Sequence, residues 1–291
     1  MGIALLASGT VFVVEVWAAL KTGSLALLSD AGHLFVDISG LLIAYLALRL
    51  ASRPATPRAT YGFTRAEVLA AAFNGLLLLG IAIGITYGAF RRLQSPLTEL
   101  DTDLVLIVAV IGLLANLFAA RLLHSHAEEN INAKGALLNV MGDALASVGV
   151  IIAALLVRFT GNPVWDTLVS VLVAGIIAYT GVGLLRSSLN ILLETSPPGI
   201  HPADVKKTVE SLPDVVNVHD LHVWTHTPGV HSATMHVSIR QESVGRFFQV
   251  TEDIEALMRE RYGLDHCTIQ LEPEGHDQVS DGFDPVHGEL H

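Results

Sequence analysis

Six long runs of apolar residues fill the first two thirds of the chain and restrict the folds that it can adopt. A helix needs about 20 mostly apolar residues to cross the hydrocarbon core of a bilayer. The runs cover residues 3–20, 25–50, 66–90, 104–123, 136–159 and 165–185. Short breaks with turn signals, such as Ser95-Pro96 and Gly161-Asn162-Pro163, separate them, so neighbouring spans run antiparallel. The sequence therefore predicts an α-helical membrane domain with six transmembrane helices.

Charge divides the 291 residues into two different parts. Only 15% of the residues are charged, and most Asp and Glu residues follow Glu194. The formal net charge of −11 argues against a nucleic-acid partner and favours a cationic ligand. We predict a membrane domain over residues 1–190, a cytoplasmic domain over 197–274 and a disordered acidic tail over 275–291. The only cysteine, Cys267, excludes an intrachain disulfide.

The region after Pro198 has the residue pattern of a small soluble domain. Helices are predicted over residues 203–211 and 247–262. Alternation of apolar and polar residues predicts strands over 215–225, 231–240 and 266–272, the first two joined by a turn at Thr227-Pro228-Gly229. The order helix, strand, strand, helix, strand suits an α+β domain of the ferredoxin-like kind, with its helices on one face of the sheet.

Basic residues near the ends of the spans predict the orientation of the chain. One set of loops holds Lys21, Arg91, Arg92 and Arg158. The opposite set holds Arg49, Arg53, Arg58, Arg65, Arg121, Lys134 and Arg186. Because cytoplasmic loops carry the excess of Lys and Arg, we expect the second set and both termini in the cytoplasm. The compact loops favour a bacterial inner membrane as the location of this integral membrane protein.

Four polar residues lie where the bilayer makes them costly. His33 and Asp37 are four residues apart in the second span, and Asn139 and Asp143 repeat the spacing in the fifth, so each pair occupies one helical face. A charge at the bilayer centre costs about 3 kcal/mol on insertion scales. One imidazole, two carboxylates and an amide oxygen can surround a divalent metal ion, whose charge the carboxylates cancel. The alternative is that these side chains only join helices by hydrogen bonds.

The two carboxylates also predict a counter-ion. Without the metal, Asp37 and Asp143 face each other in a low dielectric and cannot both stay ionised at low cost. At least one of them is then expected to take up a proton, with His33 as a further acceptor. Metal entry must expel these protons. The hypothesis that follows is exchange of metal for protons.

The remaining polar residues of the spans are assigned to structure. We expect Glu15, Asn74 and Asn116 to form hydrogen bonds between helices. Asp30 and Asp166, near the starts of the second and sixth spans, are expected to cap those helices.

Four stretches of sequence follow one another in a recognisable order. They are TGSLALLSDAGH at residues 22–33, RATYGFTRAEV at 58–68, GDALASVG at 142–149 and VHDLHVW at 218–224. In these stretches the chain resembles the cation diffusion facilitators, a family of metal exporters that includes zinc transporters. The resemblance implies a homodimer with six spans per subunit, a transport site between spans two and five, and a ferredoxin-like cytoplasmic domain that dimerises and can bind metal. It also implies proton-coupled efflux by rocking of the helices.

Asn139 departs from the pattern of this family. Zinc members generally place a histidine one turn before the aspartate of the fifth span, whereas Asn139 offers a weak, neutral oxygen donor. We expect Zn²⁺ as the transported ion. The alternative is an exporter selective for Mn²⁺, Fe²⁺, Co²⁺ or Cd²⁺.

Histidines are frequent in the predicted cytoplasmic domain. By analogy with the regulatory sites of the family, we group His219 and His236 with His266 or Glu272 and expect Zn²⁺ there as a regulatory ion. His219 and His222 are predicted to lie on opposite faces of their strand. The alternative is a sheet that carries surface histidines and no metal.

Other classes of function are weighed against an exchanger. The helical metalloprotease pattern is absent, because Leu34 and Phe35 follow His33 and no second histidine lies four residues on. We expect no enzymatic activity and no organic cofactor. A metal-gated channel or a sensor that does not transport is the other alternative, and coupled proton movement would separate an exchanger from both.

Overall fold

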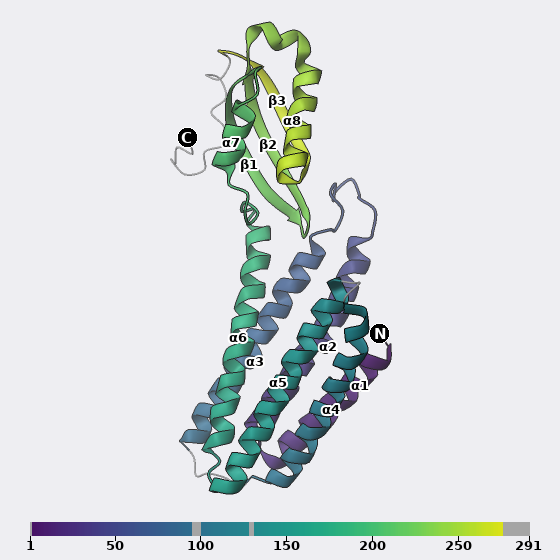
Figure 1. The fold of residues 1–291 in the computed structure, drawn as a ribbon, viewed down its shortest axis with the longest axis vertical. Helices are drawn as coiled ribbons and strands as arrows, with labels where there is room; N and C mark the ends of the chain where they lie inside the picture. The colour runs from purple at the N-terminus through teal and green to yellow at the C-terminus, as the bar shows by residue number, and fades with distance from the viewer. Residues whose placement is uncertain (1, 95–99, 128–130, 276–291) are drawn as a thin grey trace. The chain divides into compact units, whose positions relative to one another are not determined.

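A computed structural model describes residues 2–94, 100–127 and 131–275 (Figure 1). Within these ranges, six long helices precede the small domain: α1 (Gly2–Thr22), α2 (Leu25–Ala51), α3 (Ala66–Leu93), α4 (Thr102–Ala127), α5 (Ile131–Thr160) and α6 (Val164–Leu192). By length and apolar composition, five helices of the described part, in α2 to α6, can cross a membrane. The 21-residue α1 is a sixth apolar helix. The predicted helical membrane domain is confirmed.

Helix α2 joins two apolar cores of the bundle. Ala26 and Leu27 pack with residues of α1, α4 and α5. Further along the helix, Val36 packs with residues of α3 and α6. Many large apolar side chains of the helices point outward and are exposed, among them Leu41, Phe73, Phe118 and Tyr179. Apolar residues on all sides of a helix are typical of a membrane span, in which lipid covers the outer face.

Two glycines let α3 and α6 approach each other closely, and Figure 1 shows these two helices side by side. A Cβ on Gly75 would stand 3.0 Å from the backbone oxygen of Gly181, and a Cβ on Gly181 would stand 3.1 Å from that of Gly75. Small residues of this kind allow membrane helices to gain van der Waals contact. Any side chain at either position would have to move the neighbouring backbone.

The small domain consists of α7 (Pro202–Glu210), β1 (Val215–Thr227), β2 (Val230–Ile239), a 3₁₀ turn η1 (Gln241–Arg246), α8 (Phe247–Tyr262) and β3 (Leu264–Pro273). The sheet has the order β1-β2-β3, with β1 antiparallel and β3 parallel to β2. Helix α7 packs on β1 and α8 on β3, and the two helices share one apolar core with the strands (Figure 1). The predicted α+β order is confirmed.

Strand β1 contains a bulge that corrects one prediction. His219 pairs with His236, and His222 pairs with Thr234, so three steps along β1 match two steps along β2. Asp220 has a left-handed backbone, with φ of 49°. The extra residue returns His222 to the face that His219 occupies, because side chains alternate along both strands. The prediction that these two histidines lie on opposite faces was wrong.

The chain divides into two compact units, residues 1–49 with 70–186 and residues 50–69 with 187–291. The domain boundaries predicted from the sequence, at residues 190 and 197, stay predictions. The predicted disordered tail falls on residues 276–291, which are outside the described residues.

Candidate metal centres

One group of metal-binding side chains lies inside the helical bundle. His33 and Asp37 stand one turn apart on α2, and Asp143 projects toward them from α5. The Nδ1 atom of His33 is 3.4 Å from an oxygen of Asp37 and 3.3 Å from an oxygen of Asp143. One potential ligand atom from each of the three residues lies within 4.8 Å of the others. The structure therefore brings together three of the four side chains that the sequence predicts at this site.

Asn139 is the fourth predicted ligand. It belongs to α5, one turn before Asp143. Its side chain lies outside the described part of the structure, so its role as a ligand stays a prediction.

The donor set of this group suits a divalent ion. His33 Nδ1 is buried and makes no hydrogen bond of good geometry among the described residues, and Asp143 is only 7% exposed. An imidazole nitrogen between two carboxyl groups leaves a position that a metal ion can occupy, and two ionised carboxylates balance its charge. A nearly neutral loaded site is what passage through a low dielectric requires.

A second group lies on the sheet of the small domain. His236 alternates along β2 with Met235 and Val237, which belong to the core under the helices, so it points to the opposite face. Glu272 reaches both imidazoles: its Oε2 is 3.4 Å from Nε2 of His219, and its Oε1 is 3.2 Å from Nδ1 of His236. The carboxyl group is only 3% exposed. Two nitrogens and one carboxylate thus face a common point.

Unpaired polar atoms show that this second group fits a metal ion. Both ring nitrogens of His219, Nδ1 of His236 and Oε2 of Glu272 are buried and lack hydrogen-bond partners among the described residues. Leaving buried polar atoms unpaired is costly, whereas a bound cation would satisfy them. Zn²⁺ accepts imidazole nitrogen and carboxylate oxygen ligands together.

His266 does not join this group. It pairs with Ser232, whereas the residue of β3 opposite His236 is Gln270. Four residues of a strand correspond to about 13 Å. Of the two alternatives that the sequence left open for completing the site, the geometry favours Glu272.

Asp220 is a neighbour of the second group that sequence reasoning missed. Its carboxyl oxygens lie 3.0 Å from Nε2 of His222 and 3.7 Å from Nε2 of His236. The bulge in β1 aims this side chain at both rings. Nothing in the local sequence predicts the left-handed backbone of Asp220, because only pairing with β2 reveals the extra residue.

Cys267 is not part of either group. Burial raises the pKa of its thiol to about 11, and the nearby charge of Glu255 acts in the same direction. Because metal ions bind the thiolate and not the thiol, Cys267 is a poor competing ligand at neutral pH.

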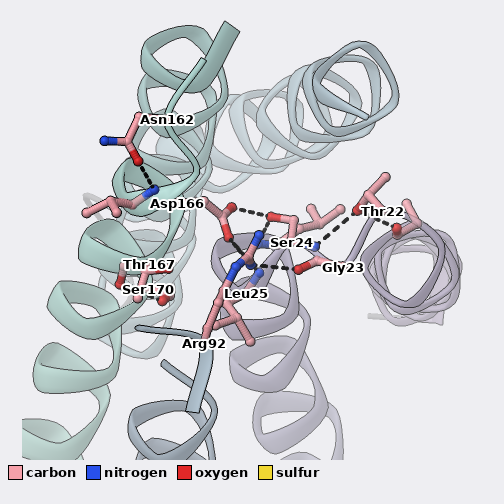
Figure 2. Close-up of polar contacts among 12 residues, drawn as sticks. Thr22, Gly23, Ser24, Leu25, Arg92, Asn162, Asp166, Thr167 and Ser170 are labelled. Atoms are coloured by element: carbon pink, nitrogen blue, oxygen red, sulfur yellow. Dashed lines mark hydrogen bonds and ion pairs between the residues drawn. The ribbon is translucent and has the colours of Figure 1, made fainter. Parts of the chain in front are cut away.

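A third polar cluster, at the ends of the helices, corrects the capping predictions. Figure 2 shows Asp166 of α6 directed at the start of α2, where it accepts hydrogen bonds from Ser24 Oγ and, at 2.8 Å, from the backbone N–H of Leu25. Arg92 of α3 pairs with the same carboxylate at 3.0 Å and donates to the carbonyl oxygen of Gly23 at 2.8 Å. Asp166 therefore caps α2 and not its own helix.

Asp30 does not cap a helix either. It is the sixth residue of α2, and its Oδ2 accepts a hydrogen bond from Ser147 Oγ of α5 at 3.1 Å. For Glu15 and Asn74 we expected hydrogen bonds between helices. One atom of each side chain, Glu15 Oε2 and Asn74 Oδ1, is buried without a hydrogen-bond partner among the described residues, so the expected hydrogen bonds stay predictions.

Comparison with protein families gives two matches along the chain. A model described as the cation efflux transmembrane domain matches residues 1–193. A model described as the cytoplasmic domain of cation efflux proteins, and named for zinc-transporter dimers, matches residues 197–274.

Several bacterial relatives are similar over nearly the whole chain. The cation efflux system protein CzcD of Alcaligenes sp. (strain CT14) is 42% identical over 270 residues, 93% of this chain and 85% of that protein. The cadmium, cobalt and zinc/H(+)-K(+) antiporter of Bacillus subtilis is 36% identical and covers 91% of this chain and 85% of its own length. The zinc transporter ZitB of Escherichia coli K12 is 37% identical, with coverage of 95% and 84%.

Solved structures also match the chain, and one of them is a C-terminal domain. The metal-bound C-terminal domain of the CzcD transporter from Cupriavidus metallidurans is 32% identical to the matched region, which is 25% of this chain and 99% of that one, with a TM-score of 0.24.

Proposed function

Because the chain belongs to the cation efflux family, the cation diffusion facilitators, whose members are transporters and not enzymes, we propose that it exports Zn²⁺ from the cytoplasm in exchange for protons. The observation that carries the proposal is the convergence of His33, Asp37 and Asp143 inside a bundle of apolar helices. The names of the relatives, which include a zinc transporter and a cadmium, cobalt and zinc antiporter, support efflux of a divalent metal.

The ligand set supplies a mechanism for the exchange. Zn²⁺ binds His33 through a neutral ring nitrogen and both aspartates as carboxylates, so loading requires that protons leave the site. When Zn²⁺ departs, the two carboxyl groups face each other without a cation in a low dielectric, and protons return. Metal and protons thus occupy the site in alternation, which couples their movements in opposite directions.

The cytoplasmic group of His219, His236 and Glu272 would hold a second Zn²⁺ as a regulatory ion. The matched family model supports dimerisation through this domain. In a homodimer, an ion that fixes β1, β2 and β3 together would report cytoplasmic zinc to the pair of subunits. The basic residues Arg53, Arg58 and Arg65 between α2 and α3 support a cytoplasmic location for both termini in a bacterial inner membrane.

Asn139 favours a second candidate substrate. An amide oxygen in place of an imidazole makes the donor set harder, and such a set suits Mn²⁺, Fe²⁺ or Co²⁺ better than it suits zinc. Cd²⁺ is a further alternative substrate, because the name of the Bacillus subtilis relative includes cadmium. Competition by each ion against zinc flux distinguishes these substrates.

The test uses purified full-length protein in liposomes, with a zinc dye and a pH dye inside. We expect an imposed pH gradient to drive zinc flux, and zinc flux to move protons in the opposite direction. Asp143→Asn keeps the shape of the side chain but removes its charge, and should lower the flux by at least about 100-fold. Asp101→Asn, which keeps an oxygen to cap α4, is the matched control and should transport normally. Zinc flux without proton movement would contradict exchange and indicate a channel, and absence of zinc flux would contradict transport of zinc.

A further inference from the structure

An arginine-rich loop joins α2 to α3 and takes no part in either group of potential metal ligands. Between residues 49 and 65 the chain has no acidic residue and four arginines, Arg49, Arg53, Arg58 and Arg65. Arg53 and Arg58 are exposed, and neither side chain forms an ion pair with a described residue. The loop therefore carries two positive charges that no described ion pair balances.

Backbone hydrogen bonds fold this loop back on itself. The N–H groups of Thr56 and Gly62 both donate to the carbonyl oxygen of Ala59, at 3.0 and 2.9 Å. Gly62 has a left-handed backbone, with φ of 70°, and a Cβ at this position would stand 3.6 Å from the backbone oxygen of Arg53. The second half of the loop is therefore held against Arg53.

A cavity of about 380 Å³ lies beside Gly62. Its wall combines apolar, aromatic and basic side chains from the loop, from the adjoining ends of α2 and α3 and from β1, among them Leu50, Tyr61, Phe63, Arg65, Leu69 and Trp224. All of these residues belong to one of the two compact units of the chain. A cavity of this size, with a mainly apolar wall and a few polar groups, is typical of sites for small organic ligands.

The polar groups of the cavity do not suit a metal ion. Nε2 of His226 is 3.2 Å from Oγ1 of Thr64, and Glu194 accepts a hydrogen bond of 2.7 Å from Arg65. The imidazole and the carboxylate are thus already engaged. Nε of Arg65, in contrast, is buried and has no hydrogen-bond partner among the described residues. The unused hydrogen-bonding group is a donor on a cation, which favours an anionic ligand.

The position of the loop indicates lipid as the source of this anion. Helices α2 and α3 are both long and apolar enough to cross a membrane, so the short loop between them lies at a bilayer surface. Tyr61 is 63% exposed and Phe63 is 38% exposed. Aromatic rings are enriched at the membrane interface, and anionic headgroups attract basic segments next to a span. A soluble anion would leave the apolar wall uncovered, whereas the chains of a phospholipid cover it.

We propose that this loop and its cavity bind an anionic phospholipid. The phosphate group pairs with Arg53 and Arg58, and the glycerol backbone with the first part of the chains lies against Tyr61, Phe63 and Trp224. A zwitterionic phospholipid carries its own cation and therefore pairs less well with the arginines. Because the wall includes residues of the loop and of β1, the bound lipid contacts both. The inference depends neither on the ion that is carried nor on the direction of transport.

The test places a quencher on the lipid and follows Trp224. In full-length protein, Trp17→Phe and Trp165→Phe leave Trp224 as the remaining tryptophan. Phosphatidylglycerol with a nitroxide near the headgroup end of one chain is titrated into the protein in uncharged detergent micelles, and phosphatidylcholine with the same label measures partitioning without headgroup recognition. We expect phosphatidylglycerol to quench Trp224 at a half-saturating concentration at least about fivefold lower. Unlabelled phosphatidylglycerol should restore the fluorescence.

Arg53→Gln and Arg58→Gln should each weaken the binding of phosphatidylglycerol about fivefold, because each removes one positive charge at the membrane surface. Both side chains are exposed, so the variants should melt at the temperature of the parent. Arg91→Gln removes an exposed arginine at the opposite end of α3 and is the matched control, which should leave the binding unchanged.

Equal quenching by the two labelled lipids would overturn the proposal, and so would equal binding by the parent and both arginine variants. Glycerol 3-phosphate separates the lipid from a soluble anion. If it displaced the labelled lipid at the same concentration as unlabelled phosphatidylglycerol, the site would recognise free phosphate esters and the assignment to lipid would be wrong. Zinc flux and proton movement in liposomes test the proposed transport function separately, so either proposal can fail while the other stands.

Discussion

His33 is the residue at which the two helices of the intramembrane group meet. Its Nδ1 stands almost midway between Asp37 and Asp143, so three potential donors are in place. We propose that a fourth donor, Asn139, decides which metal the site prefers. Asn139 is one turn before Asp143, at a position where the family resemblance of the sequence leads us to expect a histidine. Selectivity is therefore a question about one side chain.

Asn139→His should tighten zinc binding by about tenfold or more, because an imidazole nitrogen replaces a neutral amide oxygen. Mn²⁺ should compete less well in the variant. Competition between the two ions in liposomes measures the effect. Asn162→His, in the exposed break before α6, is the control for an added histidine. Equal zinc affinity in Asn139→His and the parent would show that residue 139 is not a ligand.

At the scale of elements, close contacts at small residues and one buried ion pair hold the helices in register. Gly75 and Gly181 bring the backbones of α3 and α6 together. At the ends of the same helices, Arg92 and Asp166 enclose the start of α2 (Figure 2). Both features are long-range, since each joins segments separated by more than seventy residues.

Gly75→Leu should force α3 away from α6 and lower the stability of the membrane unit by about 1–3 kcal/mol, the usual cost of overpacking. Gly80→Leu is the matched control on the same helix, because nothing lies within 4 Å of a Cβ at Gly80. Thermal unfolding in detergent micelles measures both. A melting temperature of Gly75→Leu equal to that of the control would contradict the close approach of the two helices.

Arg92→Gln should cost about 3 kcal/mol, because it leaves Asp166 buried, at 2% exposure, without its cation. The neighbouring Arg91 is exposed and is the matched control, with an expected effect of Arg91→Gln below about 0.5 kcal/mol. The same melting experiment compares the two variants. A loss of stability in Arg92→Gln that is no larger than the loss in Arg91→Gln would contradict the contribution of the ion pair.

At the scale of the whole molecule, the chain carries two groups of potential metal ligands, of similar composition and in different surroundings. Each combines imidazole and carboxylate ligands, with one histidine and two aspartates among the helices and two histidines and one glutamate on the sheet. In the function that we propose, the first group holds an ion that enters and leaves, and the second holds a regulatory ion. The two groups should therefore bind zinc independently.

Full-length protein should bind two zinc ions per chain in equilibrium dialysis followed by metal analysis. Glu272→Gln and Asp143→Asn should each bind about one, and the double variant none, because each change removes a charged ligand that the divalent ion needs. Glu274→Gln removes an exposed carboxylate close to Glu272 and should still bind two. If either single variant bound no zinc at all, the two groups would not be independent.

Most of the local structure could be predicted from the residues alone. Each predicted span falls within one helix, and each predicted strand overlaps an observed strand, because apolar periodicity follows from local geometry. The pairing of His33 with Asp37 on one face is local in the same sense, since both stand on one helix. The likeness to the cation efflux family could also be read from short motifs.

Contacts between distant segments were decided only by the tertiary structure. Helical spacing cannot show that Asp143 meets His33 or that Asp166 caps α2. Strand alternation predicts opposite faces for His219 and His222, and only the pairing of β1 with β2 corrects this. Alternation also leaves Glu272 and His266 as equal candidates for the third ligand. The register of β3 decides between them, because it brings Glu272 near His236 and places His266 opposite Ser232, four residues from His236. The physical reason is that a side chain's partner depends on which segments pack together, and pairwise packing is a property of the folded chain that no single segment carries.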